Sequence, residues 1–231
     1  MHDRWKHLRK NLFRSVEPKI ELVLMSEPQG RFKKLLTTET APGYTARASH
    51  ESKGITKDDI RLNKFLIKRG HHTPLEAVCF TFHVYGITKS LQNQWVRHRI
   101  GVGWTYRSTR NISADQNEFV YCTYDYIDDE SKVIAILRED EESAKEAIAR
   151  FKRKRELGAT KQDSRKIMPV FWNTPCYFYC NASSLRYLFS LRLEKDAEWE
   201  IRRMSRIMWE IVIKETPSLF EDFENLARRE D

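Results

Sequence analysis

The stretch Gln94-Trp95-Val96-Arg97-His98-Arg99, followed by Ser108-Thr109-Arg110, carries more information about this chain than any other. Arg97, His98 and Arg99 are consecutive basic side chains, and like charges this close repel one another unless an anion lies between them. The planar donor fork of Arg fits a phosphate, and a further Arg beside a Ser hydroxyl follows downstream. The pattern predicts a site for a ligand with several phosphates. Taken alone, it fits a solvated basic helix face about as well.

Four further parts of the sequence, in order and at nearly constant spacing, support the first interpretation. With Arg97-His98-Arg99 and the downstream Ser and Arg, they resemble the flavin-dependent thymidylate synthases. The resemblance covers roughly residues 19–225, and its strength lies in the ordered set rather than in one motif. The additional pieces are Ala46-Arg47-Ala48-Ser49, Gly70-His71-His72-Thr73-Pro74-Leu75-Glu76, Phe80 to Val84, and Asn181 to Arg192 followed by Ala197 to Ile201.

The resemblance implies an α+β fold, a single domain of the flavin-dependent thymidylate synthase type with a central, antiparallel-containing sheet and flanking helices. It also implies a methyltransferase that methylates carbon 5 of the uracil of dUMP. Methylenetetrahydrofolate would supply the methylene group, and FAD reduced by NADPH would supply the hydride. The family works as a homotetramer whose active sites are shared between subunits, so a second copy of the chain is the expected partner.

Individual site residues follow from the same resemblance. The cofactor positions are Ser49, His71, Thr73, Glu76, Arg97, His98, Arg99, Ile100 and Asn181. The nucleotide positions are Gln94, Arg97, Arg107, Ser108, Arg110, Arg165 and Arg192. Arg192 would be the catalytic residue. It would face the uracil ring and favour the ionised form, because a guanidinium stabilises negative charge and does not give up its own proton.

The sequence departs from the family pattern at ligand positions. The signature Glu is missing from Gly103-Trp104-Thr105-Tyr106-Arg107-Ser108, and one residue is inserted before Ser108. Without that gap, Arg107 would take the position of the Ser, so both residues are candidates. Ser183 and Tyr187 stand where the family commonly has Arg and Asn, and an Arg-to-Ser change removes a charge and five donors. These changes leave open a variant that methylates UMP or another pyrimidine nucleotide.

Composition limits the remaining alternatives. The chain has 231 residues, 41 Lys plus Arg against 33 Asp plus Glu, and a net charge of +8, which favours anionic partners. A non-catalytic paralogue that binds nucleotides or nucleic acid is therefore the rival class, although the motifs disfavour nucleic acid as a partner. The basic segment 1–18 lies outside the resemblance and is predicted to be an extension of the catalytic domain, residues 19–231. Trp5, Leu8 and Leu12 recur there at helical spacing, which fits a short amphipathic helix.

The same sequence argues against metal and membrane sites. Cys79, Cys122, Cys176 and Cys180 form no Cys-x-x-Cys pair, and His71-His72 lacks the spacing of metal ligands, so no metal is expected. No segment reaches transmembrane length and no secretory signal is recognisable, which makes the cytoplasm the expected compartment.

Local patterns predict the elements that carry these motifs. Strands are expected over 20–24 and 78–84, with an extended or strand segment over 171–180 and a candidate strand over 121–126. One helix is expected to begin after Thr88 and to run through the motif to Arg99, with a loop from Gly101 to about Asn117. Other helices are expected over 60–69, 139–156, 162–168, 182–193 after Asn181, and 197–211. The helix over 139–156 is expected to face solvent on most sides.

Overall fold

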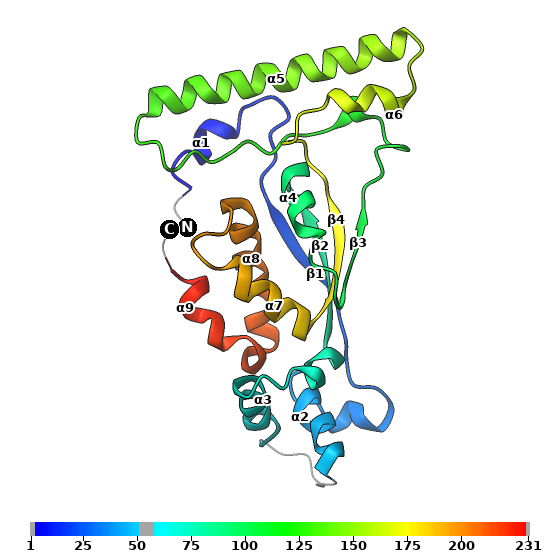
Figure 1. Cartoon of the computed structure of the whole chain (residues 1–231), viewed down its shortest axis with the longest axis vertical. Coiled ribbons are helices and arrows are strands. Elements are labelled where there is room, and N and C mark those ends of the chain that lie inside the picture. The colour runs from blue at the N-terminus through cyan, green and yellow to red at the C-terminus, as the bar shows by residue number, and fades with distance from the viewer. Residues whose placement is uncertain (1–2, 51–57, 230–231) are drawn as a thin grey trace. The chain divides into compact units, whose positions relative to one another are not determined.

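A computed structural model describes residues 3–50 and 58–229, which form an α+β fold (Figure 1). Its sheet has the strand order β1-β2-β4-β3. Neighbouring strands are antiparallel: the Asn181 amide donates to the Gly101 carbonyl at 3.1 Å, and the Ala182 amide donates to the Val78 carbonyl at 2.7 Å. The predicted fold class is confirmed. The strands are β1 (Lys19–Met25), β2 (Cys79–Tyr85), β3 (Val102–Tyr106) and β4 (Cys176–Asn181).

The sheet is apolar on one face and exposed on the other. Phe80 and Phe82 of β2 and Phe178 of β4 are buried, whereas Tyr177 and Tyr179 of β4 are exposed, as the two-residue period of a strand requires. In Figure 1, α7 (Ala182–Arg192) and α8 (Trp199–Glu215) lie on one side of the strands. The predicted apolar stripe of α8 is buried at Ile201, Met204 and Met208. Each buried side chain of this kind contributes about 1.5–3 kcal/mol.

The chain divides into two compact units. The first unit holds the segment up to Lys19, Val84–Trp95 and Thr105–Cys176. The second unit holds Ile20–His83, Val96–Trp104 and the chain from Tyr177 onward. The helices of the first unit are α1 (Lys6–Arg9), α4 (Lys89–Trp95), α5 (Glu130–Glu156) and α6 (Lys161–Ser164). The α-helices of the second unit, besides α7 and α8, are α2 (Ala41–Ala46), α3 (Asp58–Lys68) and α9 (Glu224–Ala227) among the described residues.

Short 3₁₀ segments complete both units. In the first unit they are Ala114–Gln116 and Arg165–Ile167. In the second they are Gly30–Lys34, Arg47–His50, Thr73–Ala77, Pro217–Leu219 and Glu221–Phe223.

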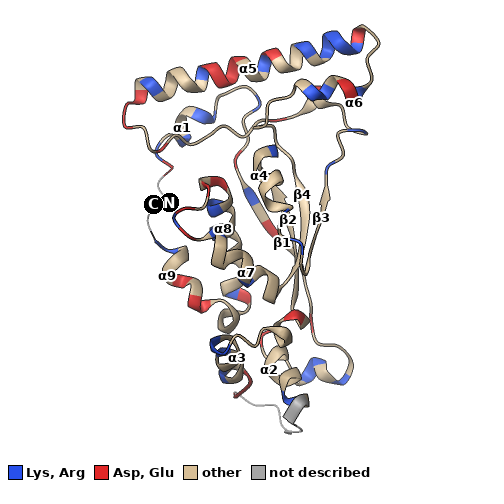
Figure 2. Ribbon diagram, viewed as in Figure 1, with Lys and Arg blue, Asp and Glu red and all other residues tan. Residues whose placement is uncertain are grey.

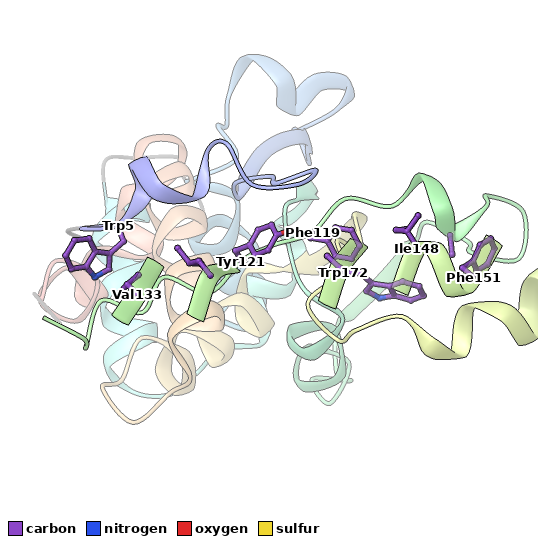
Figure 3. Packing of buried hydrophobic residues seen from close by; sticks show 10 residues of the cluster. Trp5, Phe119, Tyr121, Val133, Ile148, Phe151 and Trp172 are labelled. Carbon is purple, nitrogen blue, oxygen red and sulfur yellow. The ribbon is translucent and has the colours of Figure 1, made fainter. Parts of the chain in front are cut away.

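The core of the first unit involves both the N-terminal segment and α5 (Figure 3). Trp5 is 5% exposed and belongs to one cluster with Phe119, Tyr121 and Phe151, with Leu8 and Leu12 packed against it. The Trp5 indole also donates to the Ile127 carbonyl at 3.2 Å. The N-terminal helix is shorter than the apolar spacing suggested, yet its apolar side chains are packed in the core. The domain boundary at residue 18 stays a prediction.

The structure corrects four local predictions. The helix that carries the signature ends at Trp95, so Arg97, His98 and Arg99 lie in the turn that follows it. The expected loop after Gly101 begins with a strand, β3, because that segment pairs with β4 as the edge of the sheet. Residues 121–126 form no strand. Finally, α5 begins nine residues earlier than expected, after the Asp129 cap, and buries an apolar face made of Val133, Leu137, Ala144, Ala147, Ile148 and Phe151.

Candidate functional site

A cavity of about 550 Å³ in the second unit contains much of the signature. It lies between the segment after α4 and the helix α7, and four predicted cofactor residues and the predicted catalytic residue line it. Apart from His72, the remaining lining residues are apolar or hydroxyl-bearing. The full lining consists of His72, Arg97, His98, Arg99, Ile100, Val102, Ser183, Ser184, Tyr187, Leu191 and Arg192.

The wall formed by residues 99–102 is fixed to the start of α7 by two hydrogen bonds. The Ser184 hydroxyl donates to the Ile100 carbonyl at 2.7 Å, and the Asn181 amide donates to the Gly101 carbonyl. Gly101 has a φ of +64°, and a Cβ there would meet the Asn181 side-chain nitrogen and the Ser184 hydroxyl. Both the backbone conformation and the close approach therefore require a glycine. Ile100, 89% exposed, extends from this fixed turn.

His98 and Arg192 are joined inside the cavity. The Arg192 Nε donates to the His98 Nε2 at 3.1 Å, which requires that this imidazole nitrogen carries no proton. Burial, and secondarily the charge of Arg192, lower the pKa of His98 from its ordinary value of 6.5, so the ring is neutral at pH 7. His98 thus accepts a hydrogen bond from the Arg192 Nε and in this way fixes the position of the guanidinium.

The donor set of this cavity fits an anionic, flat ligand. Arg97 and Arg99 are exposed at the cavity, and no Asp or Glu belongs to its described lining. The Tyr187 ring is 62% exposed and meets the His98 ring edge-on, with the ring centroids 6.2 Å apart. Guanidinium groups bind phosphates and exposed aromatic rings stack on flat heterocycles. The residues present therefore suit a flavin nucleotide, although Ser183 supplies only a hydroxyl where the resemblance expects an Arg.

A second cavity of the same unit, about 1070 Å³, lies beside α3 and contains two other predicted cofactor residues, His71 and Thr73. His72 lines both cavities. Near this opening the Arg47 Nε is paired with the buried Asp59 carboxylate at 2.6 Å. Because that carboxylate is 0% exposed, the Arg47 side chain is held by the scaffold.

The three remaining predicted cofactor residues are not among the described lining of either cavity. Glu76 is exposed on the 3₁₀ segment Thr73–Ala77. Asn181 caps α7, because its side-chain oxygen accepts from the Ser184 amide at 2.8 Å. The side chain of Ser49 lies outside the described residues. Three lining residues that the sequence did not single out are Val102, Ser184 and Leu191. Ser184, three residues after the predicted cap Asn181, was the most recognisable of them.

The predicted phosphate residues of the nucleotide belong to the first unit. Arg165 donates through Nη1 to the Thr109 hydroxyl, and the Ser108 hydroxyl accepts from the Arg110 amide at 3.3 Å. These contacts gather Arg165 with the segment from Ser108 to Arg110. Gln94 is half-buried on α4, and the Arg107 amide donates to the Pro175 carbonyl at 3.0 Å. The Arg107 Nε is buried without a hydrogen-bond partner, which leaves a charged donor unused.

Neither a metal-binding cluster nor a membrane-spanning helix is found among the described residues. No group of three or more His, Cys, Asp or Glu is placed to hold a metal ion there. Among the helices of residues 3–50 and 58–229, none combines the length and the apolar character needed to span a bilayer.

Comparison with known proteins gives a consistent result. The profile of a family described as "Thymidylate synthase complementing protein" matches residues 33–218. A flavin-dependent thymidylate synthase of Clostridium tetani is 32% identical over 177 residues, covering 70% of this chain and 70% of that protein. Enzymes with the same name from Thermosipho africanus and Geobacter sulfurreducens are 29% and 30% identical. The match to the Thermosipho enzyme covers 80% of this chain and 86% of that protein. The match to the Geobacter enzyme covers 80% of this chain and 81% of that protein.

Proposed function

Because the chain belongs to the thymidylate synthase complementing protein family, we propose that it is a flavin-dependent thymidylate synthase that methylates carbon 5 of the uracil of dUMP. The observation that carries this proposal is the cavity in which Arg97, Arg99 and Arg192 come together around a neutral His98 with no carboxylate in the described lining. Uncompensated guanidinium groups of this kind serve anionic ligands.

The cofactors follow from the family. FAD is the flavin, with NADPH as its reductant and methylenetetrahydrofolate as the carbon donor; when bound, the flavin supplies the hydride and the folate the one-carbon unit. The residues of this chain bind and orient these molecules. Arg97 and Arg99 pair with the phosphates of the FAD, Tyr187 offers a ring face, and the turn at Ile100 and Gly101 sets the width of the site. His71 and Thr73 of the larger cavity extend the cofactor site, and Ser49, Glu76 and Asn181 complete it as proposed cofactor contacts.

Arg192 carries the chemical step. Its Nε is bonded to His98, and within the described residues no partner engages its Nη groups. These groups are therefore available to donate to a uracil oxygen or ring nitrogen, where they stabilise the negative charge that makes carbon 5 nucleophilic. His98 is a positioning residue for Arg192 in this scheme, because it touches the guanidinium rather than the reacting atoms.

The nucleotide contacts proposed in the first unit are Gln94, Arg107, Ser108, Arg110 and Arg165, and the resemblance also assigns Arg97 to the nucleotide. Of the two registers for the signature loop, the hydrogen bond between the Ser108 hydroxyl and the Arg110 amide supports the one with an inserted residue. Arg107, whose Nε is buried without a hydrogen-bond partner, is then the residue that we propose takes over the contacts of the missing signature Glu.

UMP is a second candidate substrate because the segment around the signature loop differs from the family. Trp104 lies in β3 and packs on Phe178 with ring centroids 5.8 Å apart, and the Tyr106 hydroxyl is buried without a partner. A buried unpaired hydroxyl costs free energy unless a ligand group satisfies it, and a ribose 2′-hydroxyl is one such group.

We also propose that the chain assembles as a homotetramer in the cytoplasm. The exposed sheet face supports assembly, because Tyr177 and Tyr179 of β4 are 43% and 40% exposed and aromatic side chains are enriched at interfaces. Sedimentation of the purified protein tests the assembly, and a monomer at micromolar concentration would contradict it.

The first experiment follows the visible absorbance of the native protein after addition of FAD, then NADPH, with and without dUMP. The expected result is a flavin spectrum that NADPH bleaches faster when the nucleotide is present, with thymidylate formed once methylenetetrahydrofolate is added. UMP is run in parallel to decide between the two substrates. A protein that cannot be loaded with FAD, or that reduces it without methylating any pyrimidine nucleotide, would contradict the proposal.

Nucleic-acid binding remains the alternative from another class. Residues 150–166 hold eight Lys or Arg against two Asp or Glu, a net charge of +6 out of the +8 of the whole chain, at the end of α5 and in α6 (Figure 2). Strong, salt-dependent binding of random oligonucleotides by a protein that takes up no flavin would favour this alternative.

A further inference from the structure

Arg14 has a backbone conformation that is unfavourable for a residue with a side chain. Its φ is +51°, in the left-handed region that glycine adopts freely and other residues adopt only at a cost in free energy. Such strain persists where the surrounding structure or the role of the side chain outweighs it. Arg14 also precedes residues 33–218, which the family profile matches, so the family assigns no role to it.

The Arg14 guanidinium is bonded to the backbone that follows the signature loop. Its Nη1 donates to the Asp115 carbonyl and, at 3.4 Å, to the Asn117 carbonyl. The backbone supports the same contact. The Phe119 amide donates to the Arg14 carbonyl and the Val16 amide donates to the Phe119 carbonyl, both at 3.0 Å. Arg14 thus joins the N-terminal segment to this part of the chain through its side chain and its backbone.

The N-terminal segment that carries Arg14 is itself held by the core of the first unit. Trp5 is buried in that core, and Phe13 packs against the same cluster. The Phe13 amide donates to the Glu141 carboxylate of α5 at 2.7 Å, and the Tyr121 hydroxyl donates to the Phe13 carbonyl at 2.9 Å. The guanidinium of Arg14 therefore extends from a fixed support.

The backbone that Arg14 holds leads through bonded turns to the predicted phosphate residues. The Asn117 amide donates to the Ala114 carbonyl at 3.1 Å. The Ile112 amide then donates to the Ser108 carbonyl at 3.0 Å. Because these turns follow one another closely, a displacement near Asn117 is transmitted to Ser108.

The opposite end of the same loop is held by the sheet. The Arg107 amide donates to the Pro175 carbonyl, which directly precedes β4, at 3.0 Å. Ser108 and Arg110 therefore lie between two anchors, one at Arg107 and one formed by Arg14.

We propose that Arg14 is a positioning residue for the nucleotide loop, defined as residues 108–113. It fixes the end of this loop and so holds Ser108 and Arg110 in the geometry that binds the nucleotide phosphate. The inference rests on the proposed function for the identity of the ligand, whereas the contact of Arg14 with the end of the loop rests on the hydrogen bonds alone. Because Arg14 touches neither substrate nor cofactor in this scheme, it sets nucleotide affinity rather than the chemical step.

The test compares Arg14→Gly, Arg14→Lys and the matched control Arg4→Ala. Arg14→Gly removes the guanidinium and suits the positive φ, so this variant is expected to fold. Arg14→Lys keeps a cationic donor. Arg4 lies in the same segment, and its guanidinium pairs with Asp128 at 2.6 Å instead of with the loop. Each of the two guanidinium groups also lies over a neighbouring ring, Arg4 over Trp5 at 4.7 Å and Arg14 over Phe13 at 5.1 Å.

Four measurements separate a positioning role from a general loss of stability. Hydrogen exchange of the amides of residues 111–117 in the ligand-free protein reports the opening of the loop, because these amides exchange when their turns open. Calorimetry gives the dissociation constant of dUMP, steady-state kinetics gives kcat, and quenching of FAD fluorescence gives the dissociation constant of FAD.

Arg14→Gly is expected to speed exchange in the loop and to weaken dUMP binding about tenfold, as expected for loss of one charge-assisted contact. The kcat at saturating dUMP and the affinity for FAD should not change, and Arg14→Lys should recover most of the affinity for dUMP. Arg4→Ala should keep the wild-type values of loop exchange and of both dissociation constants.

The inference is wrong if either loop exchange or dUMP binding fails to respond to Arg14→Gly. It is also wrong if this variant weakens FAD binding as much as dUMP binding, or if Arg4→Ala has the same effects. If loop exchange and dUMP binding depend on Arg14 but the wild-type protein methylates no nucleotide, the positioning role stands and the proposed function fails.

Discussion

The cavity of the second unit and the phosphate cluster of the first unit, which consists of Arg107 to Arg110 with Arg165, are both rich in Arg, but they hold their cations differently. In the cavity, a neutral imidazole accepts from Arg192, and hydrogen bonds from Ser184 and Asn181 fix the facing turn. In the cluster, the Arg165 guanidinium donates to the Thr109 hydroxyl, and the Ser108 hydroxyl accepts from the Arg110 amide.

The two regions therefore illustrate two ways in which a protein can bind an anion. The cavity is preorganised at Arg192, because His98 fixes this guanidinium through a neutral partner before a ligand arrives. In the cluster, Arg165 is bonded to a hydroxyl group that does not neutralise its charge, so a bound dianion would supply the compensating contact. Substitutions in the cavity should therefore change turnover and cofactor binding, whereas substitutions in the cluster should change nucleotide affinity.

The largest effect is expected from Arg192→Lys. Lysine keeps the charge, but it loses the planar fork and the Nε that bonds His98, so the group that polarises the uracil is no longer fixed. We expect kcat to fall about 10²–10³-fold with a smaller change in the KM for dUMP, since losing one preorganised donor has effects of this size. Steady-state kinetics with saturating NADPH and folate measures both constants.

The matched control is Arg138→Lys, the same change at an exposed position of α5. If Arg192→Lys raises KM and leaves kcat as in that control, Arg192 acts in ground-state binding and the division between the two regions is wrong.

The next effect concerns cofactor affinity and uses Ser183→Arg. Ser183 lines the cavity, and the resemblance expects an Arg at this position. A new guanidinium at a cavity already lined by Arg97 and Arg99 should tighten FAD about tenfold if it reaches a phosphate, because a charge-assisted hydrogen bond contributes about 1.5–3 kcal/mol. Quenching of FAD fluorescence gives the dissociation constant. Ser190→Arg, on the exposed side of the same helix, is the control and should leave FAD binding unchanged.

His98 gives a smaller, pH-dependent effect. Its pKa is lowered in the folded protein by burial and by Arg192, whereas the unfolded chain titrates near the ordinary value of 6.5. Below about pH 6.5 the unfolded state therefore takes up a proton that the folded state does not, and stability falls with pH until the folded pKa is reached. Each unit of pKa difference corresponds to about 1.4 kcal/mol.

Urea unfolding between pH 8 and pH 5.5 measures this contribution. His98→Asn should lose less stability across that range than the wild type, because an amide oxygen accepts from Arg192 at any pH. His7→Asn, at an exposed histidine, should follow the wild type. If all three proteins lose the same stability on acidification, His98 does not titrate in the way that its bond to Arg192 requires.

The sequence predicted best those features that depend on local pattern. The apolar stripe of α8, the Asn181 cap and the strand β2 follow directly from side-chain period and capping chemistry, and the structure has all three. The prediction for α5 is wrong at its start, which lies nine residues before Glu139. The charged residues that follow Glu139 obscure the apolar face to which Val133 and Leu137 belong.

What the sequence could not show depends on tertiary partners. The sequence pattern predicts that the helix carrying the signature continues to Arg99. Hydrogen bonds from the start of α7 to the carbonyls of Ile100 and Gly101 instead hold the end of the motif in a non-helical conformation. Similarly, β3 is a strand only because β4 lies beside it. The bond between His98 and Arg192 joins residues 94 positions apart, and neither residue type signals it locally.

The smallest expected effect separates two roles of Asn181. Its side-chain oxygen caps α7, so Asn181→Ala should destabilise the protein by about 1 kcal/mol. Asn181→Asp keeps a capping oxygen and should be nearly as stable as the wild type, but it places a negative charge beside the start of the cavity wall. If Asn181 also contacts FAD, the Asp variant should bind FAD more weakly while the urea midpoint is unchanged. If both variants change stability and FAD affinity in parallel, the residue acts on the flavin site only through the fold of α7.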